Sequence, residues 1–182
     1  MNDKDDNIHA GTMAALLKEK PKRGRPRRAV ARQNVYVALS QKQKKLMKQM
    51  AAQLPKGLVR ADIPDLAITT LAVRMEALRR AVADRHREIP EGITDLESLY
   101  LLWDLPLPLP DETRWTSLRV SPQEAIELGR VQGTLHVIFG VTRSETFSLA
   151  LALLQQLLED YPLAKQTMTL DEMRQKITSI YL

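Results

Sequence analysis

Residues 34–40 read NVYVALS, and this short stretch decides how the chain can fold. Val35, Val37 and Leu39 alternate with other residue types, which is the pattern of a β-strand that buries one of its two faces. The next residues, 41–54, read QKQKKLMKQMAAQL and place apolar residues four positions apart, as one side of a helix does. The sequence therefore predicts a strand that runs directly into a helix.

A turn and a second helix follow this first helix. The turn reads GLVRAD at residues 57–62, and residues 66–80, LAITTLAVRMEALRR, carry an apolar stripe at helical spacing. A single strand has no pairing partner, and two helices of this size bury little apolar surface. This strand-helix-helix unit is therefore not expected to fold alone.

The same order of elements occurs a second time in the chain. Residues 114–121, RWTSLRVS, predict a strand, and residues 122–139, PQEAIELGRVQGTLHVIF, predict a helix. Ser121 and Pro122 open this helix as an N-cap pair. Residues 146–160, TFSLALALLQQLLED, predict the second helix of this copy.

The turns between the helices show the repetition most clearly. Residues 140–145 read GVTRSE, and they match residues 57–62 at an offset of 83 positions. Two such units solve the problem of the single strand if their strands pair antiparallel and their four helices interlock.

The doubled order of strand, helix, G-x-x-R turn and helix resembles the MetJ/Arc/CopG group of ribbon-helix-helix DNA-binding proteins. Most members of this group build the fold from two chains, whereas a chain that carries both halves is similar to the tandem, TraY-like members. The resemblance implies a mainly α fold with a short two-stranded antiparallel β-ribbon, in which repeats at residues 33–83 and 114–160 form a pseudo-dimer. The alternative is a helical protein in which both predicted strands are loops.

In this group the ribbon lies in the major groove of double-stranded DNA, and its outer face contacts the bases. Arg119 is suited to guanine and Asn34 to adenine, because each can form two hydrogen bonds to the base edge. Packing on the rim of the ribbon is an equal alternative for Trp115. The outward residues expected from the alternation are Asn34, Tyr36 and Ala38 in the first strand and Trp115, Ser117 and Arg119 in the second.

The resemblance also implies phosphate contacts at the start of each second helix, where free backbone N–H groups and the helix dipole attract anions. In the second repeat Thr142 and Glu145 form the pattern of a capping box, and Arg143 and Ser144 lie in the first turn. In the first repeat Arg60 takes the corresponding place, without a hydroxyl cap.

A basic segment precedes the first repeat. Residues 20–28, KPKRGRPRR, contain six Lys or Arg, and residues 18–32 carry a local net charge of +7, which leaves −2 of the chain's total of +5 for the remainder. The order KRGRP is that of an AT-hook, in which glycine lets the backbone approach the floor of a narrow minor groove and arginines follow the A·T acceptors. A solvated basic tail is the alternative. We predict a flexible arm, residues 1–32, that binds DNA through Arg23, Gly24, Arg25, Arg27 and Arg28.

Two further segments complete the chain. Residues 84–113 separate the repeats and contain a helix, opened by Thr94 with Glu97, and a proline-rich stretch. Residues 161–182 contain a C-terminal helix. We expect the apolar faces of both helices to pack on the protein itself, and the helix within residues 94–105 and the C-terminal helix are also candidate surfaces for a protein partner.

Composition narrows the class of function. The chain has no cysteine, which excludes a disulfide framework and a zinc-thiolate site. It shows no signal-peptide pattern and no long apolar run, so we expect a cytoplasmic, nucleoid-associated protein without a membrane partner. Three isolated histidines and the lack of a Gly-rich phosphate loop argue against an enzyme, a cofactor and a metal.

Three hypotheses for the function follow. The first is a transcriptional regulator that binds specific double-stranded DNA as a monomer with an internal pseudo-dimer, associates further on DNA, and controls conjugation genes of a plasmid or mobile element. The second is an accessory protein of the relaxosome at an origin of transfer. The third is a protein-interaction module with a solvated basic tail.

Overall fold

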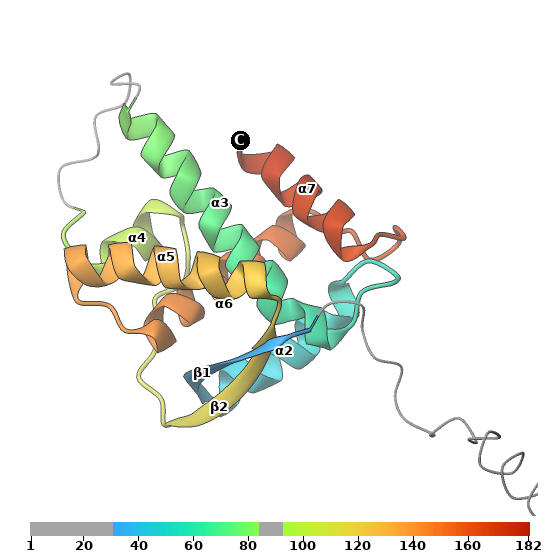
Figure 1. Ribbon diagram of the computed structural model, residues 1–182, viewed down its shortest axis with the longest axis horizontal. Coiled ribbons are helices and arrows are strands. Elements are labelled where there is room, and N and C mark those ends of the chain that lie inside the picture. Colours follow the sequence, from blue (N-terminus) through green and yellow to red (C-terminus); the bar gives the residue numbers. More distant parts are fainter. Residues whose placement is uncertain (1–30, 84–92) are drawn as a thin grey trace, which may run out of the picture. The chain divides into compact units, whose positions relative to one another are not determined.

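Two antiparallel strands lie along one side of a group of helices in the computed structural model, which describes residues 31–83 and 93–182 (Figure 1). The expected mainly helical fold with a two-stranded antiparallel sheet is confirmed, and the two predicted strands are strands and not loops. The elements are β1 (Gln33–Ser40), α2 (Gln41–Gln53), the 3-10 turn η1 (Arg60–Asp62), α3 (Ile63–Ala83), α4 (Leu96–Leu102), β2 (Thr113–Val120), α5 (Pro122–Phe139), α6 (Arg143–Asp160) and α7 (Leu170–Tyr181).

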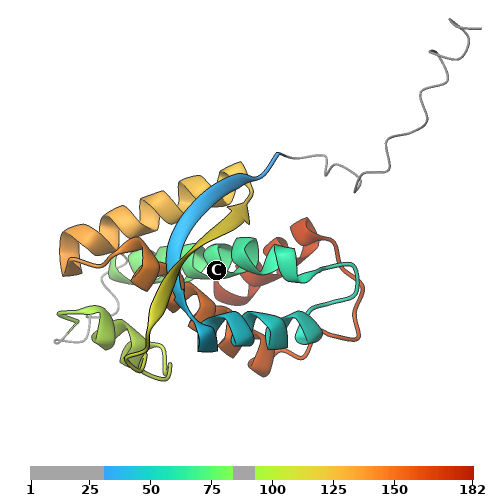
Figure 2. The same ribbon diagram turned by 90° about the horizontal axis from the view of Figure 1, so that it is seen from below.

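The two strands pair along their full lengths. Gln33 lies opposite Val120 and Ser40 lies opposite Thr113, with Tyr36 and Ser117 opposite each other in the middle. One face of this ribbon packs on the helices and the other is open, as Figure 2 shows. The alternation in the sequence produces this arrangement, because successive side chains of a strand point to opposite faces. The buried residues of the ribbon are Val35, Val37, Leu39, Leu118 and Val120.

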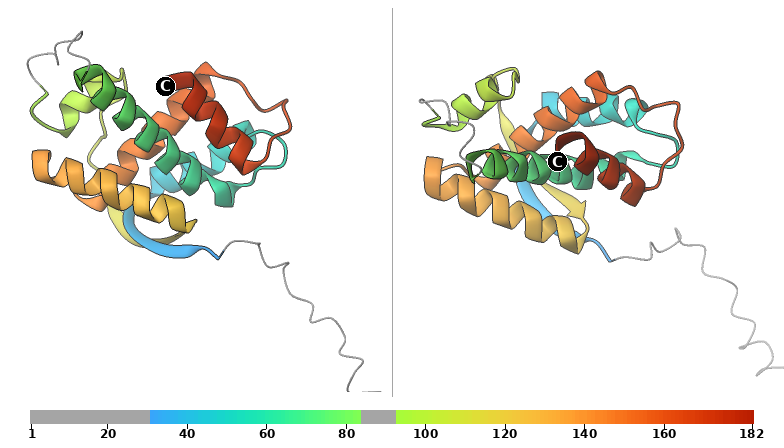
Figure 3. Two further views of the ribbon diagram at one scale, coloured as in Figure 1. Left: turned by 45° about the horizontal axis from the view of Figure 1, so that its top comes forward. Right: turned by 90° about the horizontal axis from the view of Figure 1, so that it is seen from above.

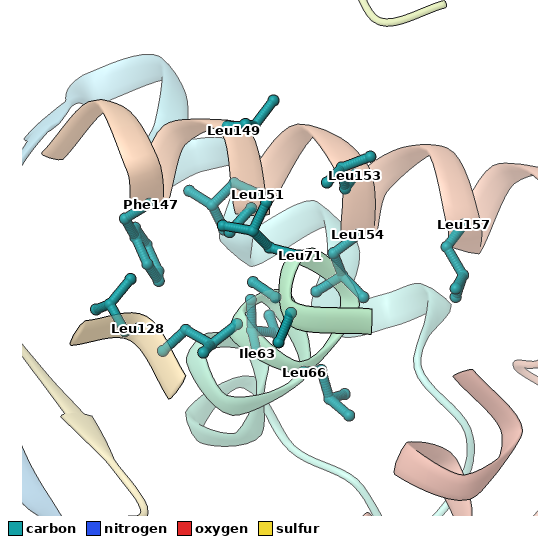
Figure 4. Packing of buried hydrophobic residues seen from close by; sticks show 14 of the residues in the cluster. Ile63, Leu66, Leu71, Leu128, Phe147, Leu149, Leu151, Leu153, Leu154 and Leu157 are labelled. Atoms are coloured by element: carbon teal, nitrogen blue, oxygen red, sulfur yellow. The ribbon is translucent and has the colours of Figure 1, made fainter. Parts of the chain in front are cut away.

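The core lies between the ribbon and the helices α3 and α6, which pack against each other (Figure 3). Leu71 on α3 and Leu151 and Leu154 on α6 are each at most 1% exposed, and Figure 4 shows them together at the contact. Helix α2 packs more extensively against α6 than against α3, and α5 packs more extensively against α3 than against α6. Each first helix of a strand-helix-helix unit therefore lies mainly on the second helix of the other unit.

Most helix starts follow local capping chemistry, with differences from expectation at α3, at α4 and, as described below, at α5. Helix α3 begins at Ile63, three residues before the predicted stretch. Helix α6 begins at Arg143, three residues before the stretch 146–160 and directly after its predicted cap, Thr142. The residue that caps α4 is Asp95 and not Thr94, because the Asp95 carboxylate accepts the Ser98 N–H at 2.8 Å. The capping box predicted at the start of α6 is confirmed.

Helices α4 and α7 use their apolar faces within the protein. Tyr100 on α4 and Trp103 directly after it are buried, and on α7, Ile177 is buried. The guanidinium of Arg74 on α3 lies over the rings of Trp103 and Tyr181, 5.3 and 4.7 Å from their centroids. Packing on the protein itself, the first expectation for these helices, is therefore observed.

In the described part of the chain, no single helix has both the length and the apolar composition to cross a membrane. Helices α5 and α6 meet that test only when taken together, as a pair bent by 111°.

Candidate nucleic-acid interface

The open face of the ribbon carries three cross-strand pairs. Asn34 lies opposite Arg119, Tyr36 opposite Ser117, and Ala38 opposite Trp115. Five of these residues are exposed and Ala38 is half-buried. The inward and outward sides expected from the sequence are thus confirmed, and contact with DNA stays a prediction.

The side chains on this face are available for a partner. Trp115 keeps 76% of its surface exposed and Tyr36 keeps 59%, so neither is covered by packing on the rim of the ribbon. The side chain of Arg119 makes no hydrogen bond or ion pair with any described residue. Large exposed aromatic and guanidinium groups on one narrow face are typical of a binding surface.

At one end of the ribbon lies the start of α6. The Ser144 hydroxyl accepts the backbone N–H of Ala38 at 2.8 Å, so this side chain ties α6 to the ribbon, a role that the sequence did not predict. The Thr142 hydroxyl caps the helix by accepting the Glu145 N–H at 3.3 Å. Arg143 between them is exposed and has no ion pair within the described ranges, so it is the residue at this end that is free for a phosphate.

At the other end lies the start of α3, and its chemistry differs. Arg60 is exposed, as expected for a phosphate contact. The next residue, Ala61, has no hydroxyl. The Arg32 guanidinium donates a hydrogen bond to the Ala61 carbonyl and another, 3.3 Å long, to the Arg119 carbonyl. The Asp62 carboxylate accepts the Val59 N–H at 2.9 Å, much as the Glu145 carboxylate accepts the Thr142 N–H at 2.8 Å at the α6 end. The difference is that Asp62 is buried beside Arg32, whereas Glu145 is exposed.

Arg32 corrects the expected extent of the flexible arm. The sequence assigns this residue to the arm, yet its side chain is only 10% exposed and its Nη2 lies 2.7 Å from Asp62 and 3.0 Å from Asp65. The sequence contains one indication of this role of Arg32. Asp62 and Asp65 lie at the start of the second helix of the first repeat, and acids need a cation when they are buried. Arg32 therefore belongs to the folded unit and not to the arm.

Arg32 belongs to a buried charge cluster, which consists of Arg32, Asp62, Asp65, Glu124 and Arg174. Asp65 accepts the Ser121 N–H at 2.9 Å, and Glu124 pairs with Arg174 at 2.8 Å. Burial raises the pKa of Asp65 above its ordinary value, against the opposing effects of the Ser121 N–H, Arg32 and Arg174. Burial also raises the pKa of Glu124, against the opposing effect of Arg174. The cluster joins the start of β1, the end of β2 and helices α3, α5 and α7.

Ser121 takes part in this cluster and not in the expected cap of α5. It occupies the N-cap position by its backbone, but its hydroxyl donates to the Glu124 carboxylate and does not bond a helix N–H. Arg174 also donates to this hydroxyl, at 3.2 Å. A buried acid one turn into the helix competes for the hydroxyl, and the local sequence pattern does not reveal that competition.

The arm residues Arg23, Gly24, Arg25, Arg27 and Arg28 lie outside the described residues. Within the described ranges, no group of three or more His, Asp or Glu side chains is placed to hold a metal ion. Comparisons with models of protein families, with curated proteins and with solved structures found no match.

Proposed function

We propose that the protein is a sequence-specific DNA-binding regulator that inserts its β-ribbon into the major groove. The observation that carries this proposal is the open face of the ribbon, where Asn34, Tyr36 and Arg119 are exposed in pairs across the two strands. The major groove is about 12 Å wide and admits a two-stranded ribbon. Amide, phenol and guanidinium groups are among those that bond base edges and phosphates there.

The register and the helix packing support two ribbon-helix-helix repeats within one chain. Tyr36 and Ser117 form one of the two middle pairs of the ladder, and Asn34 and Trp115 each lie two residues before that pair on their own strands. A two-fold axis through the Tyr36–Ser117 pair would place each of these residues on its counterpart in the other strand. The packing of α2 on α6 and of α5 on α3 follows the same exchange.

The two ends of the ribbon would hold DNA unequally. At the α6 end, the exposed Arg143 and the first backbone N–H groups of the helix favour a phosphate. At the α3 end, the buried Asp62 and Asp65 lie at the start of the helix, and the exposed Arg60 is the cation that the preceding turn offers to a phosphate. We therefore expect a bound sequence that is not a good palindrome.

The basic arm would add a contact to the adjacent minor groove. Arg28 lies four residues before Arg32, which is held in the fold, and at ~3.3 Å each these residues span about 13 Å from that point toward the groove beside the ribbon. Tethering raises the effective concentration of the arm at its site.

A selection from random duplex DNA followed by affinity measurements tests the proposal. Arg119→Ala should weaken binding to the selected site by ~1–3 kcal/mol and remove the preference at one base position. Lys176→Ala, which removes one exposed positive charge on α7, is the matched control and should leave base preference unchanged. Unchanged affinity and preference in Arg119→Ala would contradict the ribbon as the reading surface.

The same experiment separates the other hypotheses. A protein-interaction module would show no preference for any duplex over random competitor. Mapping of the bound sites then distinguishes a regulator, whose sites lie at promoters, from an accessory protein of a relaxosome, whose sites lie at the origin of transfer.

A further inference from the structure

Helix α5 has an apolar face that the described part of the chain leaves open. Ile126 and Val137 keep 66% and 84% of their surfaces exposed, and Gly129 and Gly133, which lie between them, are exposed as well. Spacings of three, four and four residues place these four residues on one side of the helix. Figure 3 shows α5 along one edge of the group of helices, so a partner can reach this face.

The two glycines of this face have no packing reason within the described chain. A Cβ atom added at Gly129 or at Gly133 would meet no described atom within 4 Å, and neither residue has a positive φ. Glycine in the interior of a helix is destabilising relative to alanine, because it loses more conformational freedom on folding. Glycine is favourable at such positions where another backbone approaches the helix closely. The two glycines therefore indicate a partner that packs closely on this face.

The face is complementary to itself. Gly129 and Val137 lie four residues on either side of Gly133, and Ile126 and Gly140 lie seven residues on either side of it. If two copies of α5 cross antiparallel at Gly133, each large residue of one copy lies opposite a glycine of the other. Gly140, which ends the helix, is exposed and leaves the same open space as the other two glycines. A patch that meets its own copy in this way is the usual interface of a two-fold dimer.

Charge and size indicate how strong such a contact is. Glu127 and Arg130, which lie beside the face, pair with each other at 2.8 Å, so two copies meet here without repulsion between unpaired charges. The helix has 18 residues and is therefore about 27 Å long and about 10 Å across. A contact of that size is smaller than the ~800 Å² per partner of a standard interface, so we expect weak association.

We infer that the protein forms a weak two-fold dimer in solution through α5, with the two helices antiparallel and crossing at Gly133. Val137 of one copy lies against Gly129 of the other, and Ile126 lies against Gly140. The expected Kd is about 0.1–1 mM. Each chain keeps its own ribbon, and at micromolar concentrations the copies are separate, so unfolding measured in that range reports on the single chain. The dimer does not depend on the proposed DNA binding, and it is tested without DNA.

The test is sedimentation equilibrium of the full-length protein at concentrations from about 10 µM to about 1 mM, which include the expected Kd. The mean mass should rise with concentration from 20.7 kDa toward twice that value. Val137→Glu places a charge in the contact twice and should weaken the dimer by at least ~10-fold. The matched control is Leu109→Glu, which alters an apolar residue outside α5 that is 77% exposed, and it should leave the dimer unchanged.

A second variant separates contact between copies from a role in folding. Gly133→Leu keeps the two helices apart at their crossing point and should weaken the dimer by at least ~10-fold. The same variant in dilute solution should unfold at the same or a higher urea concentration, because leucine favours a helix more than glycine does. The inference is overturned if the wild type stays a single chain up to ~1 mM, if either α5 variant associates like the wild type, or if Leu109→Glu weakens association equally.

A single cysteine tests the crossing point itself. The chain has no cysteine, so Gly133→Cys adds one thiol, and at a two-fold axis the thiols of two copies meet. A disulfide needs Cα atoms about 4.4–6.8 Å apart, which two helices in close contact provide. With oxidised glutathione, Gly133→Cys should form a covalent dimer at least ~10-fold faster than Leu109→Cys at the same concentration. Equal rates would overturn the crossing at Gly133.

Discussion

Replacement of Arg32 by methionine should destabilise the protein strongly at neutral pH, even though this residue follows directly on a basic arm. Asp65 is fully buried and Asp62 is 5% exposed, and the Arg32 guanidinium lies 3.0 and 2.7 Å from their carboxylates. Methionine fills a similar volume but removes the guanidinium that contacts both carboxylates. Removal of one partner from a buried ion pair typically costs 3–5 kcal/mol, roughly.

We expect the lower end of that range, ~3 kcal/mol at pH 7, because Arg174 also attracts Asp65 and remains in place. For a protein of this size, such a loss corresponds to a fall in Tm of about 6–12 °C. It is a large part of a typical total stability of about 5–15 kcal/mol. Urea unfolding followed by circular dichroism measures the change.

The loss should be smaller at low pH. Burial already raises the pKa of Asp65, and removal of Arg32 raises it further because a lowering influence is lost. A carboxyl group whose pKa is raised in the folded state stabilises the protein fully below its unfolded pKa, and this stability is lost as the pH rises through the folded pKa. The difference in stability between wild type and Arg32→Met should therefore grow from pH 4 to pH 7.

A second substitution supplies the control. Asp65→Asn added to Arg32→Met removes the uncompensated charge and should recover at least about half of the loss at pH 7. Arg79→Met, which breaks an exposed pair with Glu76, should leave the unfolding midpoint unchanged. A loss below ~1 kcal/mol at pH 7, or a double variant no more stable than Arg32→Met, would refute the reasoning that Arg32 neutralises these acids.

Three further outcomes are expected. Ser144→Ala removes the hydroxyl that accepts the Ala38 N–H and should cost ~1 kcal/mol in urea unfolding, and an unchanged midpoint would show that this bond contributes nothing to stability. Because both strands of the ribbon come from one chain, the unfolding midpoint should not change over about a hundredfold range of protein concentration, whereas strands paired between chains would raise it with concentration. Deletion of residues 1–30 should make the slope of log K for DNA binding against log salt concentration shallower by roughly 0.9 for each lost phosphate contact. The double substitution Arg23→Ala with Arg25→Ala should abolish any preference for flanking A·T pairs. An unchanged slope and an unchanged preference would indicate a solvated tail.

Local patterns in the sequence were sufficient for the elements and for the faces of the strands. Val35 and Val37 alternate with Asn34 and Tyr36, and the pleat of a strand converts that alternation into one buried and one open face. The capping box at Thr142 was also predictable, because it depends on residues three positions apart. Such features depend only on residues a few positions apart, so they can be predicted without knowledge of the tertiary structure.

Tertiary contacts decided what local patterns could not. In the sequence, Arg32 follows directly on a basic stretch and looks like part of it. Only the packing of α3 beside it brings Asp62 and Asp65 close enough to pair with it. The Ser144 hydroxyl accepts the N–H of Ala38, which lies 106 residues earlier in the chain. Burial and charge pairing depend on which segments meet, and the desolvation that gives these contacts their energy appears only when they have met.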